Sequence, residues 1–289
     1  MHRRDLASLV ALSTLALTVG VGCPEEPKPT PPKPVGATSA APVVKAPPSA
    51  AAATPPVVNT KAGPLGSATI KGVINFSGKA PEMKVPKKRK DAEFCKTKEV
   101  KYNSVVVDGG KLAETFVRIA NDSVKGEYPA PAKRSEIDQV DCMYTPRIQG
   151  VIAGQEIDIK NQDGTLHNVH TFKGTETWFN QAQPKGSPDL SKELEDTKVI
   201  KFTCDVHPWM RGFVIVSSHP FFAVSGKDGT FAIEKVPAGK YEVEAWHPHY
   251  GLKKATVDVA EGKTAEVTFA YDGTEKEPDE NKDEMKDLF

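Results

Sequence analysis

CDVHPWM, residues 204–210, indicates the class of fold when it is taken together with the segments on either side of it. TKVIKFTC (197–204) leads into it and RGFVIVSS (211–218) leads out, and both have the apolar, β-branched composition of strands. A short loop whose two ends belong to paired strands is rigid. This one holds a thiol, an imidazole and a thioether, in a chain of 289 residues with only four cysteines and five methionines.

Short alternating segments separated by turns continue outward from this loop, between about residues 67 and 271. Turn signals such as DGG (108–110), KDG (227–229) and PAG (237–239) lie between them. Many short strands with glycine-rich turns predict an all-β fold of packed sandwiches. Only SPDLSKELEDTK (187–198) has the composition of a helical turn or two. The other segments that we predict to be strands are ATIKGVINF (68–76), AETFVRIA (113–120), EIDIKN (156–161), KYEVEAWH (240–247), KKATVDVA (253–260) and AEVTFAY (265–271).

A second stretch, DGTLHNVHTF (163–172), offers histidines to the same site. Residues three apart on an extended strand point to opposite faces, so only one of His167 and His170 is expected to lie with Cys204. The available donors are then two imidazoles, one thiolate and one thioether. Two His and one Cys with a distant Met form a type 1 copper site, and a thioether is a poor zinc ligand. The pattern therefore predicts copper.

At these residues the chain resembles the cupredoxins, the type 1 (blue) copper family, in its amicyanin- and plastocyanin-like form. TLHNVHTF and CDVHPWMRGFVIV are similar to the copper-binding segments of that family, and YTPRIQGVIAGQEIDIKNQD (144–163) is similar to the approach to the first ligand. The resemblance covers residues 136–218 and implies a Greek-key cupredoxin sandwich. The polar stretch 174–196 departs from the family pattern.

The resemblance also implies a role for each site residue. His167 and His207 are expected to be the imidazole ligands, Cys204 the thiolate and Met210 the axial ligand of one copper ion. Asn168 is expected to form a hydrogen bond across the two ligand segments. The family places the edge of the second histidine at an apolar surface, where electrons would enter and leave.

A second module follows the copper segment. FFAVSGKDGTFAIEKVPAGKYEVEAWHPHYGLKKATVDVAEGKTAEVTF (221–269) resembles the carboxypeptidase-regulatory-like, transthyretin-like β-sandwich, and we bound this module at 219–272. The strands predicted in 67–135 belong either to this second sandwich, with the copper domain inserted in it, or to an extended cupredoxin. His247 and His249, in WHPHYG, are open as an auxiliary metal site.

The two ends of the chain differ in composition from its middle and lack the pattern of short strands. Residues 1–23 have an arginine pair, an apolar run and Cys23, and look like a bacterial lipoprotein signal whose cysteine is lipidated. Residues 24–66 are rich in Pro and Ala and predict a disordered linker. Residues 273–289 are acidic without apolar periodicity and predict a disordered tail.

If the N-terminus is an export signal, the state of the four cysteines can be predicted. Export implies an oxidising compartment, in which cysteines pair. With Cys23 assigned to lipid and Cys204 to the loop, Cys95 and Cys142 remain, and a disulfide between them is the simplest interpretation.

Together these features predict an exported, lipid-anchored blue copper protein of a bacterial periplasm or outer cell surface. It would carry single electrons between partners such as a c-type cytochrome and a periplasmic dehydrogenase, and would not be an enzyme. The formal net charge of zero gives no indication of nucleic-acid binding. Two alternatives are a periplasmic copper-binding or delivery protein and a cell-surface scaffold with a vestigial metal site. Zinc held by His167, His170, Cys204 and His207 conflicts with the opposite strand faces.

Overall fold

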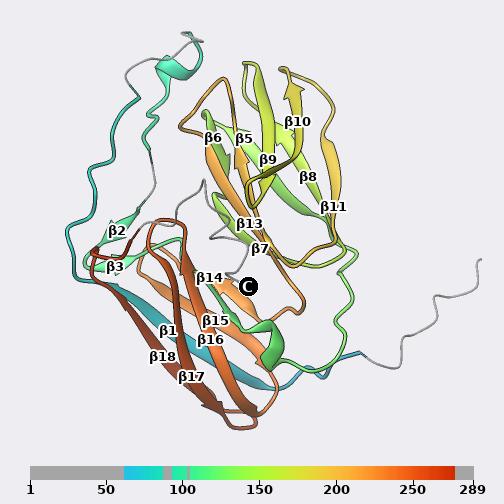
Figure 1. The fold of residues 1–289 in the computed structure, drawn as a ribbon, viewed down its shortest axis with the longest axis vertical. Coiled ribbons are helices and arrows are strands. Elements are labelled where there is room, and N and C mark those ends of the chain that lie inside the picture. Colours follow the sequence, from blue (N-terminus) through green and yellow to red (C-terminus); the bar gives the residue numbers. More distant parts are fainter. Residues whose placement is uncertain (1–61, 87–92, 103–104, 277–289) are drawn as a thin grey trace, which may run out of the picture. The chain divides into compact units, whose positions relative to one another are not determined.

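The computed structural model describes residues 62–86, 93–102 and 105–276, which lie within one compact unit, Val57–Phe289. These residues form eighteen strands and two short 3₁₀ helices, η1 (Cys95–Thr97) and η2 (Asn121–Ser123) (Figure 1). The predicted all-β sandwich class is confirmed. Within the described ranges, no helix has the length and apolar character needed to cross a membrane. The predicted signal with Cys23, and most of the predicted linker and tail, lie outside the described residues.

One pair of sheets, called the inserted sandwich below, contains the strands between residues 135 and 217. Its first sheet has the order β10–β9–β12–β13–β7 and its second the order β11–β8–β5–β6. Strands β7 and β13 pair in parallel, as do β5 and β8. The strands are β5 (Ser135–Val140), β6 (Met143–Thr145), β7 (Ile148–Ile152), β8 (Gln155–Asn161), β9 (His167–Lys173), β10 (Glu176–Gln183), β11 (Leu190–Leu194), β12 (Val199–Thr203) and β13 (Arg211–Ser217).

A second pair of sheets, the outer sandwich, takes strands from both sides of that insertion. One sheet has the order β15–β1–β3–β2, with β18 pairing in parallel with β1, and the other has the order β14–β4–β16–β17. The strands are β1 (Ala68–Phe76), β2 (Val107–Asp108), β3 (Lys111–Leu112), β4 (Phe116–Ile119), β14 (Phe222–Val224), β15 (Thr230–Val236), β16 (Gly239–His247), β17 (Gly251–Val259) and β18 (Thr264–Tyr271).

The chain leaves the outer sandwich and returns to it at one place. The Asn121 side-chain oxygen, just after β4, accepts hydrogen bonds from the Ser218 backbone N–H at 3.2 Å and from the Ser218 hydroxyl at 3.0 Å. In chain order, the outer sandwich is therefore interrupted by the inserted one, and the exit and return points are held together.

Two sequence patterns account for the strands: apolar residues alternate with polar ones where one face of a strand is exposed, and they run continuously where both faces are buried. Along β18, Val267, Phe269 and Tyr271 are buried while the residues between them are exposed. All four residues of β4 are buried, because Phe116 packs in the cluster that contains Trp246 while Val117 and Ile119 pack in the core of the outer sandwich.

Strand β13 contributes to two cores at once. Val214 and Val216 belong to the core of the inserted sandwich. Phe213 and Ile215, on the opposite face, belong to a separate cluster that includes Trp246 of β16. The ring centroids of Phe213 and Trp246 are 5.6 Å apart. This third cluster joins the two sandwiches by apolar contact.

The prediction of helical turns in 187–198 is wrong. Residues 190–194 form β11, which pairs antiparallel with β8 from Leu190↔Ile159 to Leu194↔Gln155. Leu194 is buried in the inserted sandwich core. Pairing along the edge of an existing sheet outweighs the helical preference of a short polar segment.

A buried histidine near the return point makes stability depend on pH. His219 Nε2 bonds to the Ile119 carbonyl at 3.0 Å and its Nδ1 accepts the Phe221 N–H at 3.2 Å, so the neutral ring is satisfied on both sides. Burial, and then the Arg118 charge, lower the pKa of His219 to about 4.

We expect the folded state to lose stability as the pH falls from 6.5 towards 4. The unfolded chain, with a histidine pKa of about 6.5, binds the proton more readily in this window, which amounts to roughly 2–3 kcal/mol near pH 4.5. Urea unfolding at pH 4.5 and 7.5 measures the difference. In His219→Gln the free energy of unfolding should depend less on pH. Part of the dependence should remain, because burial also lowers the pKa of His247, which therefore destabilises the folded state in the same direction as the pH falls. An equal change in the free energy of unfolding between pH 4.5 and 7.5 in the parent protein and in His219→Gln would contradict this role of His219.

Candidate metal centre

The first ligand candidate lies at the start of β9. His167 and Val169 point into the inserted sandwich, and His167 has no exposed surface. His170 lies on the other face, partly exposed, with its Nδ1 2.9 Å from an Asp205 carboxylate oxygen. The structure thus separates the two histidines by strand face and leaves His167 in the interior.

The loop 204–210 connects β12 to β13, so the ladder between these strands holds its two ends. Met210 N–H donates to the His207 carbonyl at 2.9 Å, which closes the loop on itself. The Asn168 side-chain oxygen accepts the Asp205 N–H at 2.7 Å. Asn168 therefore fastens the loop to β9, the strand that carries the other ligand candidate.

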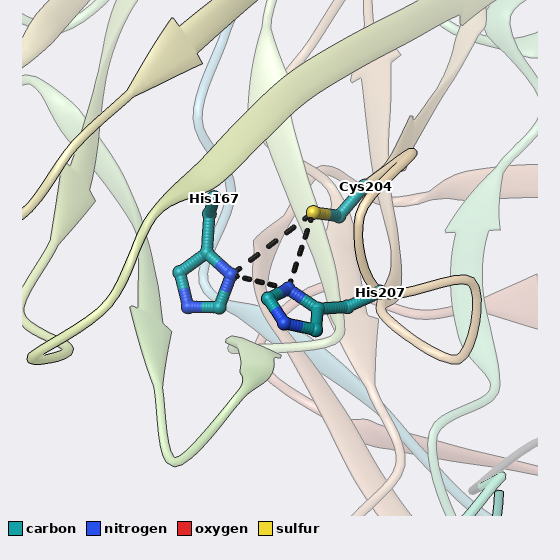
Figure 2. Close-up of side chains that lie close together, drawn as sticks. All are labelled: His167, Cys204 and His207. Carbon is teal, nitrogen blue, oxygen red and sulfur yellow. Dashed lines mark hydrogen bonds between the residues drawn. The ribbon is translucent and has the colours of Figure 1, made fainter. Parts of the chain in front are cut away.

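Three donor side chains converge in the interior, as Figure 2 shows. Cys204 Sγ lies 3.5 Å from His207 Nδ1 and 4.0 Å from His167 Nδ1, and the two Nδ1 atoms are 2.8 Å apart. The exposed fraction is 2% for Cys204 and 0% for both histidines. Two distant segments thus direct a sulfur and two nitrogens at one point from which water is excluded.

The spacing of these donors fits a metal ion. Bonds of about 2.0 Å to nitrogen and 2.3 Å to sulfur, at angles near 110–120°, place nitrogen and sulfur about 3.5–3.8 Å apart and two nitrogens about 3.3–3.6 Å apart. Both sulfur–nitrogen distances agree with this within a few tenths of an ångström. The two Nδ1 atoms, 2.8 Å apart, need to separate by about 0.5–0.8 Å, a movement within the range of side-chain adjustment.

Asp163 orients the first histidine, a role that the sequence reasoning missed. Its Oδ2 lies 2.8 Å from His167 Nε2, and its two oxygens accept the backbone N–H groups of Asp141 and Cys142, each at 2.8 Å. A carboxylate on the outer nitrogen directs the other nitrogen, Nδ1, towards an ion. The signal was present as a carboxylate four residues before the histidine.

Charge in the site prepares the thiolate ligand and places a proton on His167 in competition with a metal ion. Burial opposes protonation of His167, but hydrogen bonds with Asp163 and Cys204 outweigh it and raise the pKa of His167 to about 9. Burial likewise favours the neutral thiol, but contacts with His167 and His207 lower the pKa of Cys204 to about 6. Near neutral pH the metal-free site therefore holds a thiolate beside an imidazolium. An incoming cation would replace the imidazolium proton on Nδ1.

Two further residues of the loop are fully enclosed. Met210 and Trp209 belong to the same buried cluster as Cys204. The Trp209 indole N–H donates to the Cys142 carbonyl at 2.9 Å, and its ring centroid is 5.0 Å from that of His207. Trp209 packs against the site, and axial ligation by Met210 stays a prediction.

The structure contains a disulfide between Cys95 and Cys142, the pair expected from the cysteine count. Cys95 Sγ lies 3.5 Å from His207 Nε2. The expectation of an exposed His207 edge is wrong, because His207 is fully buried and the segment that carries Cys95 lies against its outer nitrogen.

His247 and His249 are separate from this centre. The His249 backbone N–H donates to His247 Nδ1 at 3.1 Å, and His247 is fully buried on β16. Across the described ranges, the converging donor groups are His167 with Cys204 and His207, and Cys142 with Asp163 and His167; neither includes His247 or His249.

Asp163→Asn is expected to weaken metal binding by about 10- to 100-fold, because the amide no longer holds His167 by a charged hydrogen bond. Competition with a chelator of known affinity measures the change. Asp196→Asn, which removes a surface partner of Lys173, is the matched control and should leave affinity unchanged. Equal affinities for Asp163→Asn and the parent protein would show that the carboxylate does not support the ligand.

The family comparison gives one match. Residues 205–286 match the family model described as ER membrane protein complex subunit 7, beta-sandwich domain. That description names a subunit of a membrane protein complex and does not name a copper protein. The match begins within the loop 204–210 and continues through the last strands of the outer sandwich, under a third of the chain. No curated protein matches.

Solved structures give only weak similarities. A purple cupredoxin from Nitrosopumilus maritimus is 23% identical, with 29% of this chain and 99% of that one covered and a TM-score of 0.26. A reduced amicyanin mutant is 20% identical over 35% of this chain and 98% of that one, with a TM-score of 0.28. A copper-containing nitrite reductase from Thermus scotoductus SA-01 is 16% identical over 32% of this chain and 24% of that one, with a TM-score of 0.27. These similarities do not assign a family.

The predicted membership in the cupredoxins, combined with a carboxypeptidase-regulatory-like module, is therefore wrong. The family match names a different β-sandwich domain over the residues assigned to that second module, and the cupredoxin similarities are too weak to support the assignment. The physical reason is that the copper motif comprises a few residues on two short segments. Such a set can be placed on more than one β-sandwich, so it indicates a site and not a family.

The same match corrects the predicted function, partners and location. The matching family is named for a subunit of an ER membrane protein complex. This contradicts a blue copper electron carrier, or its periplasmic delivery and scaffold alternatives, tethered by lipid in a bacterial periplasm or on the cell surface. Redox partners such as a cytochrome or a dehydrogenase, and a role in electron transfer, have no support.

Proposed function

We propose that this protein binds one copper ion at His167, Cys204 and His207, with Met210 as a further donor. The observation that carries the proposal is the convergence of the three donors, within 4.0 Å of one another, in a site closed to water. Asp163 and Asn168 hold the two ligand segments in place. The Cys204 thiolate is available to the ion, which takes the place of the proton on His167.

Copper is favoured over zinc by the chemistry of the donors. Two imidazoles and one thiolate suit both metals, but structural zinc takes four strong donors in a tetrahedron, whereas copper accepts three with a weak thioether. We propose binding without turnover of a substrate, because the donors are buried and leave no position that a substrate could reach from solvent.

The experiment titrates the metal-free full chain with Cu(I) under anaerobic conditions, and with Zn(II), each against a competing chelator. One equivalent of Cu(I), bound more tightly than Zn(II), is the expected result, with affinity rising with pH as the proton on His167 is displaced. Absence of one-to-one binding, or tighter binding of zinc, would refute the copper proposal.

A second candidate function rests on the family match over 205–286. We propose that the outer sandwich, which supplies most of the matched strands, takes part in assembly with a membrane protein complex, as the family's name indicates. The tagged full chain, expressed in a eukaryotic cell, should co-purify with subunits of the ER membrane protein complex. Recovery of none of those subunits would contradict this role.

A further inference from the structure

We propose that the Cys95–Cys142 disulfide is a redox-controlled latch on the metal centre. It rests on the proposed function: with the disulfide closed, the copper ion exchanges slowly, and once a dithiol reductant opens the disulfide, the ion exchanges freely. The proposal assigns a regulatory role to a bond that would otherwise only cross-link two segments.

One half of the disulfide covers the second histidine. Cys95 Sγ lies 3.5 Å from Nε2 of His207, on the side of the ring opposite the nitrogen that faces Cys204. Both His207 and Cys95 are fully buried. The outer edge of His207 is therefore closed by the segment that carries Cys95.

The other half acts on the first histidine through the backbone. Cys142 N–H donates to Asp163 Oδ2 at 2.8 Å, and the same oxygen lies 2.8 Å from His167 Nε2. The Cys142 carbonyl accepts the Trp209 indole N–H at 2.9 Å. A single disulfide is thus connected to the outer nitrogens of both imidazole ligands.

The covering segment, residues 93–102, is held by apolar packing as well as by the disulfide, because Val100 is buried in the core of the inserted sandwich and Phe94 packs against that core. Its regular structure is the single turn η1. Lys98 pairs with Asp141 at 2.6 Å in a partly exposed contact, and the Phe94 ring packs on Gly164 so closely that a Cβ there would lie 2.9 Å from Cε2. A partly exposed ion pair contributes little. The disulfide is the covalent cross-link between the covering segment and the inserted sandwich, so breaking it leaves the segment held by non-covalent contacts that can open locally.

The chemistry of opening is a thiol–disulfide exchange. A dithiol attacks one sulfur through its thiolate, the Cys95–Cys142 bond breaks, and the second thiol of the reductant completes the exchange. The protein gains two electrons and two protons as two thiols, and the dithiol leaves as a disulfide. Since both sulfurs are buried, the attack occurs when the covering segment opens locally.

The test measures copper exchange in the full chain. The protein is kept oxidised or reduced anaerobically with dithiothreitol that is then removed, and each form is loaded with Cu(I) and mixed with bathocuproine disulfonate. Transfer of Cu(I) should be about 10- to 100-fold faster after reduction, because removing a cross-link favours local opening. Reoxidation should restore the slow rate, and Cys95→Ser/Cys142→Ser should stay fast. Lys98→Ala, which keeps the disulfide, is the matched control and should stay slow.

A second readout needs no metal. Diethyl pyrocarbonate, followed by peptide mass spectrometry, should modify His207 only after reduction, while His170 reacts in both states and buried His247 in neither. Equal exchange rates together with an unchanged His207 would overturn the latch. Absence of bound copper in both states would overturn the proposed function alone, because the modification experiment still reports on the covering segment.

Discussion

Serine in place of Cys204 is expected to remove most of the affinity for copper. Structural zinc sites bind with about 10–16 kcal/mol, and on that scale one of three or four donors supplies about 3–5 kcal/mol, or roughly 10²- to 5 × 10³-fold in affinity. A hydroxyl at this buried position is a hard, neutral donor where Cu(I) requires a soft, anionic one. Cu(I) competition against bicinchoninate measures the loss.

Two observations make the Cys204 result specific. The fold should persist, because serine is close in size to cysteine and the loop is held by Asn168 and by the β12–β13 ladder. His170→Gln, a change on the same strand as His167 but on its other face, should bind copper as the parent does. If Cys204→Ser retains parental affinity, the thiolate is not a ligand.

Alanine in place of Trp246 is expected to cause the largest loss of stability. Trp246 has no exposed surface and lies in the cluster that joins the two sandwiches, opposite Phe213. Truncating a fully buried tryptophan typically costs about 3–5 kcal/mol, because apolar contacts are lost and a cavity remains. Urea unfolding of the full chain measures the change in the free energy of unfolding.

Trp178→Ala provides the comparison for Trp246→Ala. Trp178 is on the edge strand β10, partly exposed, with the Lys173 ammonium 4.6 Å from its ring centroid. Its removal should cost less than about 1 kcal/mol. A loss at Trp246 no larger than at Trp178 would show that the joining cluster contributes little to stability.

The strands of this protein could be predicted because its alternation is regular. In β18, Val267, Phe269 and Tyr271 point inward at period two, and the turns before and after that strand carry glycine. The site donors could be predicted for a similar local reason. The strand-face argument that separates His167 from His170 needs only their spacing, and a loop between two strands needs only its own sequence.

What escaped prediction depends on contacts between segments far apart in the chain. The burial of His207 depends on Cys95, more than a hundred residues away, in a segment without periodicity. The role of Asp163 depends on backbone N–H groups of the turn at 141–142, which no local pattern reveals. The strand at 190–194 forms because the edge of β8 is available to it.

The family and the function were mispredicted for a different reason. A few ligand residues on two short segments define a coordination geometry, and coordination geometry is shared by unrelated sandwiches. The same limit applies to the turn and aromatic pattern of 221–269, which any sandwich of short strands can carry.

The parallel pairing of β1 with β18 determines where mechanical tension would travel. A pull applied at Ala68 and Tyr271 acts on the start of β1 and the end of β18, two strands that run in the same direction. Such a pull loads their ladder in shear, with many backbone hydrogen bonds sharing the force. The inserted sandwich leaves and returns at Asn121 and Ser218, so the centre at Cys204 lies outside that line of force.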